Sequence, residues 1–205
     1  MKNLLLTFLF ITTITYGSTN SELKKNDRAF AINYLEMTLQ QLVDEIKNLS
    51  KEELLYTPKD GGWSIMNCLE HIASTEPAII EGAKKLIIKN EVLVDKDLTT
   101  NDGLVITNVT DRTKKVKSPE LFNPSNKWTS LEEVMKVIKA NRASTIKLLK
   151  ETNADLRHLI GKYAYGDIDA YQLFIVSAAH GYRHTLQIRE ILDELKSDKT
   201  EESTD

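Results

Sequence analysis

The chain has 205 residues, a length typical of one compact domain with a full hydrophobic core. Hydrophobic residues make up 41% and charged residues 28% of the sequence, which is typical of a globular protein and not of a disordered one. The net charge of -3 carries no basic excess, so we do not expect nucleic acid as a partner. Few glycines and prolines, with many leucines, lysines and glutamates, favour an all-α fold.

The N-terminus has the features of a secretory signal peptide over residues 1–18. Lys2 supplies a short positive region, Leu4–Ile11 form an apolar run, and Gly17 and Ser18 offer small residues for cleavage. The apolar run is shorter than the about 20 residues that a membrane-spanning helix needs. We therefore expect export to the periplasm or the extracellular space, without stable membrane insertion after cleavage. An uncleaved membrane anchor is the alternative interpretation.

Residues 19–195 are expected to form one four-helix-bundle domain. Apolar residues recur with helical spacing over four long stretches, which are about 27–49, 65–88, 130–151 and 169–195. Ser64 and Asp169 are the expected N-caps of the second and fourth helices, because each is followed by a run of that spacing. Residues 196–205 lack apolar side chains, so we expect them to be a disordered tail.

The segment between the second and third predicted helices, residues 90–127, differs from the rest of the chain. It contains Pro119 and Pro124 and shows no sustained helical period. A crossover of this length can run from one end of a bundle to the other, so the two helices that it joins need not be antiparallel neighbours. We also expect a short turn over residues 154–160 and a loop over residues 161–166.

The histidines are the residues most suggestive of chemistry. His180 and His184 stand four residues apart in the last predicted helix, where both imidazoles face the apolar stripe. Buried imidazoles are costly unless they have partners, so either a metal ion accepts both or they are hydrogen-bonded structural histidines. His71 in the second helix could face them across the bundle. Three neutral nitrogen ligands suit Zn, Ni, Fe or Co and leave positions open for water or substrate.

Two motifs around these histidines resemble the DinB/YfiT-like family of metal-binding four-helix bundles. The first consists of Gly62–Ile65, GWSI, followed by Leu69–Ala73, LEHIA, at the start of the second helix. The second is Ala179–Ile188, AHGYRHTLQI, in the last helix. The resemblance covers about residues 27–195.

The resemblance implies an up-down-down-up bundle with the long crossover between its second and third helices. It also implies a metal site at His71, His180 and His184, often holding Zn or Ni, and frequently a homodimer. Family members of known activity are thiol-dependent transferases that act with bacillithiol or mycothiol, and some relatives look like hydrolases. We therefore expect a metal-dependent hydrolase or thiol-dependent transferase that acts on a small molecule. A non-catalytic metal-binding or stress-related module is the alternative.

Four further residues have structural or functional interpretations. Glu76, five residues after His71, could act as a general base or orient a ligand, although a solvated helix carboxylate is the simpler interpretation. Gln187 could hydrogen-bond a ligand histidine or pack at the surface. Trp63 is expected to pack over the start of the second helix. His158 lies in a polar segment and is expected at the surface.

Overall fold

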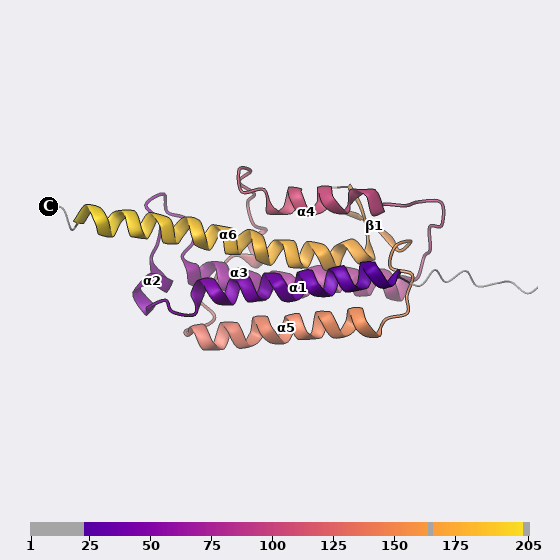
Figure 1. Cartoon of the computed structure of the whole chain (residues 1–205), viewed down its shortest axis with the longest axis horizontal. Helices are drawn as coiled ribbons and strands as arrows, with labels where there is room; N and C mark the ends of the chain where they lie inside the picture. The colour runs from indigo at the N-terminus through magenta and orange to yellow at the C-terminus, as the bar shows by residue number, and fades with distance from the viewer. Residues whose placement is uncertain (1–22, 164–165, 203–205) are drawn as a thin grey trace, which may run out of the picture.

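The computed structural model describes residues 23–163 and 166–202 and consists mainly of helix. Four long helices lie side by side (Figure 1): α1 (Lys25–Ile46), α3 (Ile65–Lys89), α5 (Leu131–Glu151) and α6 (Ala170–Glu202). α6 packs against α1 and α3, and α5 packs against the same two helices. The expected helical bundle is therefore confirmed. The predicted signal peptide, residues 1–18, lies outside the described residues.

Shorter elements join the long helices. They are α2 (Lys51–Leu55), η1 (Thr99–Asn101), α4 (Asp102–Thr110), η2 (Glu120–Phe122), β1 (Ile160–Tyr163) and β2 (Gly166–Asp169). The two strands form an antiparallel hairpin directly before α6, with Ile160 opposite Asp169. Among the helices of the described ranges, none is long and apolar enough to cross a membrane.

Two segments are more ordered than the sequence predicted. The crossover contains the nine-residue helix α4, which packs along α6 and has no side-chain N-cap. A helix this short is not stable alone, so contacts such as the 3.0 Å hydrogen bond from Gln172 Nε2 to Asp102 Oδ1 stabilise it. In the predicted loop over residues 161–166, residues 161–163 belong to β1 and residue 166 belongs to β2. Its four-residue strands carry glycine and charged residues and lack the apolar alternation by which strands are recognised.

The last helix is also longer than predicted. α6 continues to Glu202, so the prediction of a disordered tail is wrong for residues 196–202. Polar contacts hold this end of the helix, because Tyr56 Oη donates to Glu194 and Asp198 at 3.0 and 2.8 Å. These bonds replace the apolar contacts that the tail sequence does not provide.

A polar layer divides the core of the bundle. One hydrophobic cluster surrounds Phe174 near the hairpin, and the other surrounds Ile72 near the start of α3. Between them lie four residues, one from each long helix, which are Thr38, Glu76, Arg142 and Gly181. Their contacts determine how the helices are aligned along the bundle axis.

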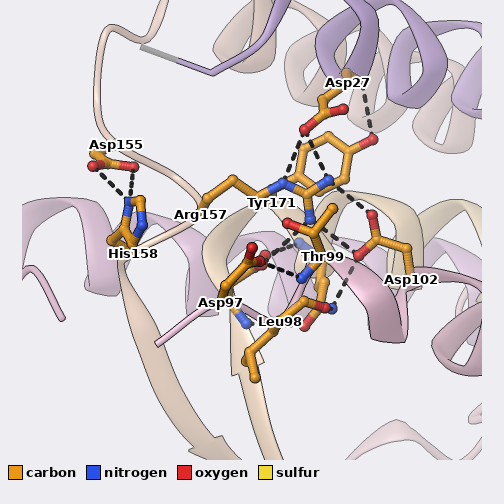
Figure 2. Close-up of polar contacts among 11 residues, drawn as sticks. Asp27, Asp97, Leu98, Thr99, Asp102, Asp155, Arg157, His158 and Tyr171 are labelled. Carbon is orange, nitrogen blue, oxygen red and sulfur yellow. Dashed lines mark hydrogen bonds and ion pairs between the residues drawn. The ribbon is translucent and has the colours of Figure 1, made fainter. Parts of the chain in front are cut away.

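Arg157 connects the start of α1 with α4 and the hairpin. Its guanidinium pairs with Asp27 at 2.9 Å and Asp102 at 2.8 Å, and it lies over the ring of Tyr171 with Cζ 3.7 Å from the centroid (Figure 2). Asp169 lies 3.3 Å away and is fully buried. Burial raises the pKa of Asp169 to about 7, although the guanidinium opposes this shift. The guanidinium of Arg157 therefore serves as a counter-charge to three carboxylates, those of Asp27, Asp102 and Asp169.

Replacing Arg157 should measure how much this network stabilises the fold. We expect Arg157→Ala to lower the free energy of unfolding by about 2 kcal/mol, somewhat less than for a fully buried ion pair because Asp27 and Asp102 are partly exposed. Urea denaturation measures the change. Lys162→Ala on the exposed side of β1 is the control and should change stability by less than about 0.5 kcal/mol. Equal effects of the two substitutions would contradict the expectation.

Candidate metal centre

The three histidines singled out in the sequence converge in the structure. One ring nitrogen from each of His71, His180 and His184 lies within 4.8 Å of the other two. Nε2 of His71 lies 3.2 Å from Nε2 of His180. The ring centroid of His184 lies 4.7 Å from each of the other two centroids. The prediction that α3 and α6 bring these residues together is confirmed.

The polar layer explains why the histidines meet. Glu76 of α3 lies beside Gly181 of α6, and one turn further along the antiparallel pair His71 lies beside His184. A Cβ atom on Gly181 would lie 2.8 Å from Oε1 of Glu76 and 2.9 Å from Nη2 of Arg142. Only glycine allows so close an approach without a shift of these groups. The alignment of α3 and α6 that follows places the three imidazoles at one level.

Oxygen acceptors orient two of the three imidazoles. Nδ1 of His71 donates to the carbonyl of Phe122 at 2.8 Å, and Nδ1 of His184 donates to Oε1 of Gln187 at 3.0 Å. With the hydrogen on Nδ1, the Nε2 atom of each ring carries a free lone pair. Nδ1 of His180 is buried and has no hydrogen-bond partner among the described residues.

Burial keeps these imidazoles neutral. Desolvation lowers the pKa of His71, and desolvation together with the charge of a protonated His71 lowers the pKa of His180 to about 3. Desolvation and the two neighbouring histidines hold the pKa of His184 well below its usual range. At neutral pH all three rings therefore offer nitrogen lone pairs.

The donor set fits a divalent metal ion. Nitrogen ligands about 2.0 to 2.1 Å from a tetrahedral zinc ion lie about 3.3 Å apart. The distance between Nε2 of His71 and Nε2 of His180 is 3.2 Å. Without an ion, neutral His180 can carry its hydrogen on Nε2 and donate it to the lone pair of His71 Nε2. A divalent ion bound between the two nitrogen atoms would take the place of this hydrogen. Three protein ligands also leave coordination positions open, unlike the four-ligand sites of structural zinc.

Some neighbours of the triad were expected from the sequence and others were not. Trp63 packs against two of the rings, with its centroid 4.8 Å from His71 and 6.1 Å from His184. Gln187 forms a hydrogen bond with His184, which is the first of the two roles predicted for it. Sequence reasoning missed the carbonyl of Phe122, because a backbone acceptor from a distant segment leaves no side-chain signal.

Glu76 lies in the interior of the bundle and not in solvent. Its side chain is 2% exposed and paired with Arg142, which donates from Nη2 to Oε1 and from Nε to Oε2, the latter at 3.4 Å. The interpretation of Glu76 as a solvated carboxylate is therefore wrong. Since both carboxylate oxygens are occupied by Arg142, the geometry favours a structural role over that of a general base.

His158 takes no part in the cluster. Its side chain is 24% exposed, and Nδ1 lies 2.9 Å from both carboxylate oxygens of Asp155 (Figure 2). The prediction of a surface position is corrected to a partly buried one, because Asp155 is buried and holds the ring against the chain.

Comparison with known proteins agrees with this geometry. Residues 34–188 match the model of a protein family described as the DinB superfamily. Among solved structures, the chain is similar to YfiT from Bacillus subtilis, described as a probable metal-dependent hydrolase with an unusual four-helix bundle topology. The TM-score is 0.55 at 13% identity, covering 86% of this chain and 91% of YfiT, and at this identity the likeness shows the fold alone. No curated protein matches the chain.

The two possible roles of Glu76 predict different results for Glu76→Gln. A structural role leaves Arg142 buried without a counter-charge, so the free energy of unfolding should fall by about 3 kcal/mol. Urea denaturation measures this loss, and Glu81→Gln on the exposed face of α3 is the matched control. Wild-type stability in the Glu76→Gln variant would contradict the structural assignment.

Proposed function

Because the chain belongs to the DinB superfamily, we propose that it is a metal-dependent hydrolase whose divalent ion is held by His71, His180 and His184. The observation that carries the proposal is the convergence of three neutral imidazoles. The likeness to YfiT, described as a probable metal-dependent hydrolase, supports the reaction class. Neutral nitrogen ligands favour Zn or Ni, with Fe as a further candidate.

The residues around the triad have distinct tasks in this proposal. A divalent ion with three protein ligands supplies the Lewis acidity that activates water at neutral pH. The Phe122 carbonyl and Gln187 hold the Nδ1 hydrogens of two ligands, which keeps their Nε2 atoms directed at the ion. Trp63 packs over two of the rings and restricts solvent access from its side. The substrate would be a small molecule that binds at the open coordination positions.

Thiol-dependent transfer is the second candidate reaction. The same ligand set and open positions could bind and activate a thiolate. The proposed export of the chain favours hydrolysis, because the cytosol is the compartment that maintains a reduced thiol pool. A non-catalytic metal-binding module would have the same ligands but would turn over no substrate.

Three further features belong to the proposal. An up-down-down-up order of the four long helices is supported by the colour gradient in Figure 1, where α1 and α6 run one way and α3 and α5 the other. Export to the periplasm or the extracellular space is supported by the pattern of residues 1–18. A homodimer is supported by the family resemblance.

Metal analysis tests the proposed site directly. The mature protein, purified without a His tag, should bind about one Zn or Ni ion per chain. His71→Ala, His180→Ala and His184→Ala should each lose at least about a hundredfold in affinity, because two remaining imidazoles bind weakly. His158→Ala is the matched control and should bind as the wild type does.

Activity assays then separate the candidate reactions. Loaded protein would be screened for ester, amide and thiol-transfer substrates, and activity should disappear in the three ligand variants only. Absence of metal from the wild type after incubation with Zn, Ni and Fe would refute the proposal. Stoichiometric metal without any turnover would favour the non-catalytic module.

The pH dependence of metal binding tests whether burial keeps the ligands neutral. Imidazoles with the ordinary pKa of 6.5 are about nine-tenths protonated at pH 5.5, and three of them would weaken binding up to about a thousandfold. Because burial lowers the pKa of His71, His180 and His184, we expect a loss of less than about tenfold between pH 7.5 and 5.5. Chelator competition at both pH values measures the ratio. A metal affinity about a thousandfold weaker at pH 5.5 than at pH 7.5 would show that the three histidines titrate with the ordinary pKa of imidazole.

A further inference from the structure

The crossover segment, residues 111–127, lies against ligands from both α3 and α6. The carbonyl of Phe122 accepts the Nδ1 hydrogen of His71 at 2.8 Å. Arg112 donates from Nη1, at 3.5 Å, to the same amide oxygen that accepts the Nδ1 hydrogen of His184. One segment therefore orients one ligand directly and another through an intervening amide.

Glu70, the residue before His71, binds the downstream part of the crossover segment. Its side chain is buried, and Oε1 accepts hydrogen bonds from the backbone N–H of Ser125 at 2.7 Å, the hydroxyl of Ser125 at 2.9 Å and the N–H of Lys127 at 3.3 Å. A buried carboxylate requires such donors, and here one short stretch supplies all three. Because Ser125 follows Phe122 by three residues, Glu70 holds in place the carbonyl that orients His71.

Arg183, the residue before His184, binds the upstream part of the crossover segment. Its buried guanidinium donates from Nη2 to the carbonyl of Lys114 at 2.7 Å and from Nη1 to the carbonyl of Asp111. A third bond, at 3.2 Å, reaches the carbonyl of Val109 at the end of α4. The residues that directly precede His71 and His184 thus each make several hydrogen bonds to the crossover segment.

We propose that Glu70 and Arg183 are positioning residues that dock the crossover segment on the metal site, so that docking and metal binding strengthen each other. The inference rests on the proposed metal site. Metal coordination at Nε2 of His71 makes its Nδ1–H a stronger donor to Phe122, and the docked carbonyl in turn makes Nε2 a better ligand. By thermodynamic linkage, the factor by which docking of the segment raises the metal affinity equals the factor by which bound metal raises the equilibrium constant for docking.

Zinc affinity in Glu70 variants provides the first test, measured by competition with a chromogenic chelator. Glu70→Ala should weaken zinc binding by about 10 to 100-fold, the range for loss of a group that orients a ligand. Glu70→Gln keeps an acceptor oxygen and should recover most of the affinity. Glu120→Ala, on the exposed surface of the same segment, is the control and should change affinity less than about twofold.

Limited trypsin digestion of the wild type provides a second test that needs no variant. Cleavage after Lys114, Lys115 and Lys117, followed by mass spectrometry, should be at least about tenfold slower with bound zinc than without it. If the wild type binds zinc but trypsin cleaves it at equal rates with and without zinc, the inference is overturned. A zinc affinity equal to that of the wild type in Glu70→Ala would also overturn it. A wild type that binds none of Zn, Ni and Fe would refute the proposed function, and this inference with it.

Discussion

The buried ion pair between Glu76 and Arg142 is the interaction on which the alignment of the bundle depends. Both side chains are 2% exposed, and such charges are tolerated only where every polar atom has a partner. Arg142 therefore also donates to the carbonyl of Leu35 at 2.7 Å and to Oγ1 of Thr38 at 2.8 Å. With Gly181 leaving room for these groups, all four long helices meet at one level. Sliding α3 or α5 along its axis would separate the two charges, and sliding α1 would remove two acceptors of Arg142. Sliding α6 would move Gly181 away and bring a side chain against the pair.

The metal centre follows from this alignment. His180 precedes Gly181 directly, and His71 lies about one turn from Glu76, so the contact that fixes α3 against α6 also sets the distances between imidazoles. Replacement of a buried ion pair by apolar residues is often neutral for stability, whereas removal of one partner alone is costly. The burial that this alignment imposes also lowers the pKa values of all three histidines.

The crossover adds the remaining part of the site. Two helices supply the ligands, but the orientation of His71 depends on a carbonyl from η2, and the crossover is held by α4 packing on α6. Arg157 holds the far end of the same assembly, because it joins Asp102 at the start of α4 to Asp27 at the start of α1. The structure is thus a bundle with a covering segment, and the site lies where the two meet.

The sequence by itself determined the helical class, the bounds of α3 and α5 to within a residue, and the three histidines, because helical periodicity, N-caps and i, i+4 spacing are local patterns. Only the tertiary structure decided that α4 and the hairpin form, that α6 extends to Glu202, and that Glu76 is buried. Glu76 and Arg142 are 66 residues apart, and His71 and Phe122 are 51 apart. Contacts over such separations have no local pattern, because they arise from packing between elements.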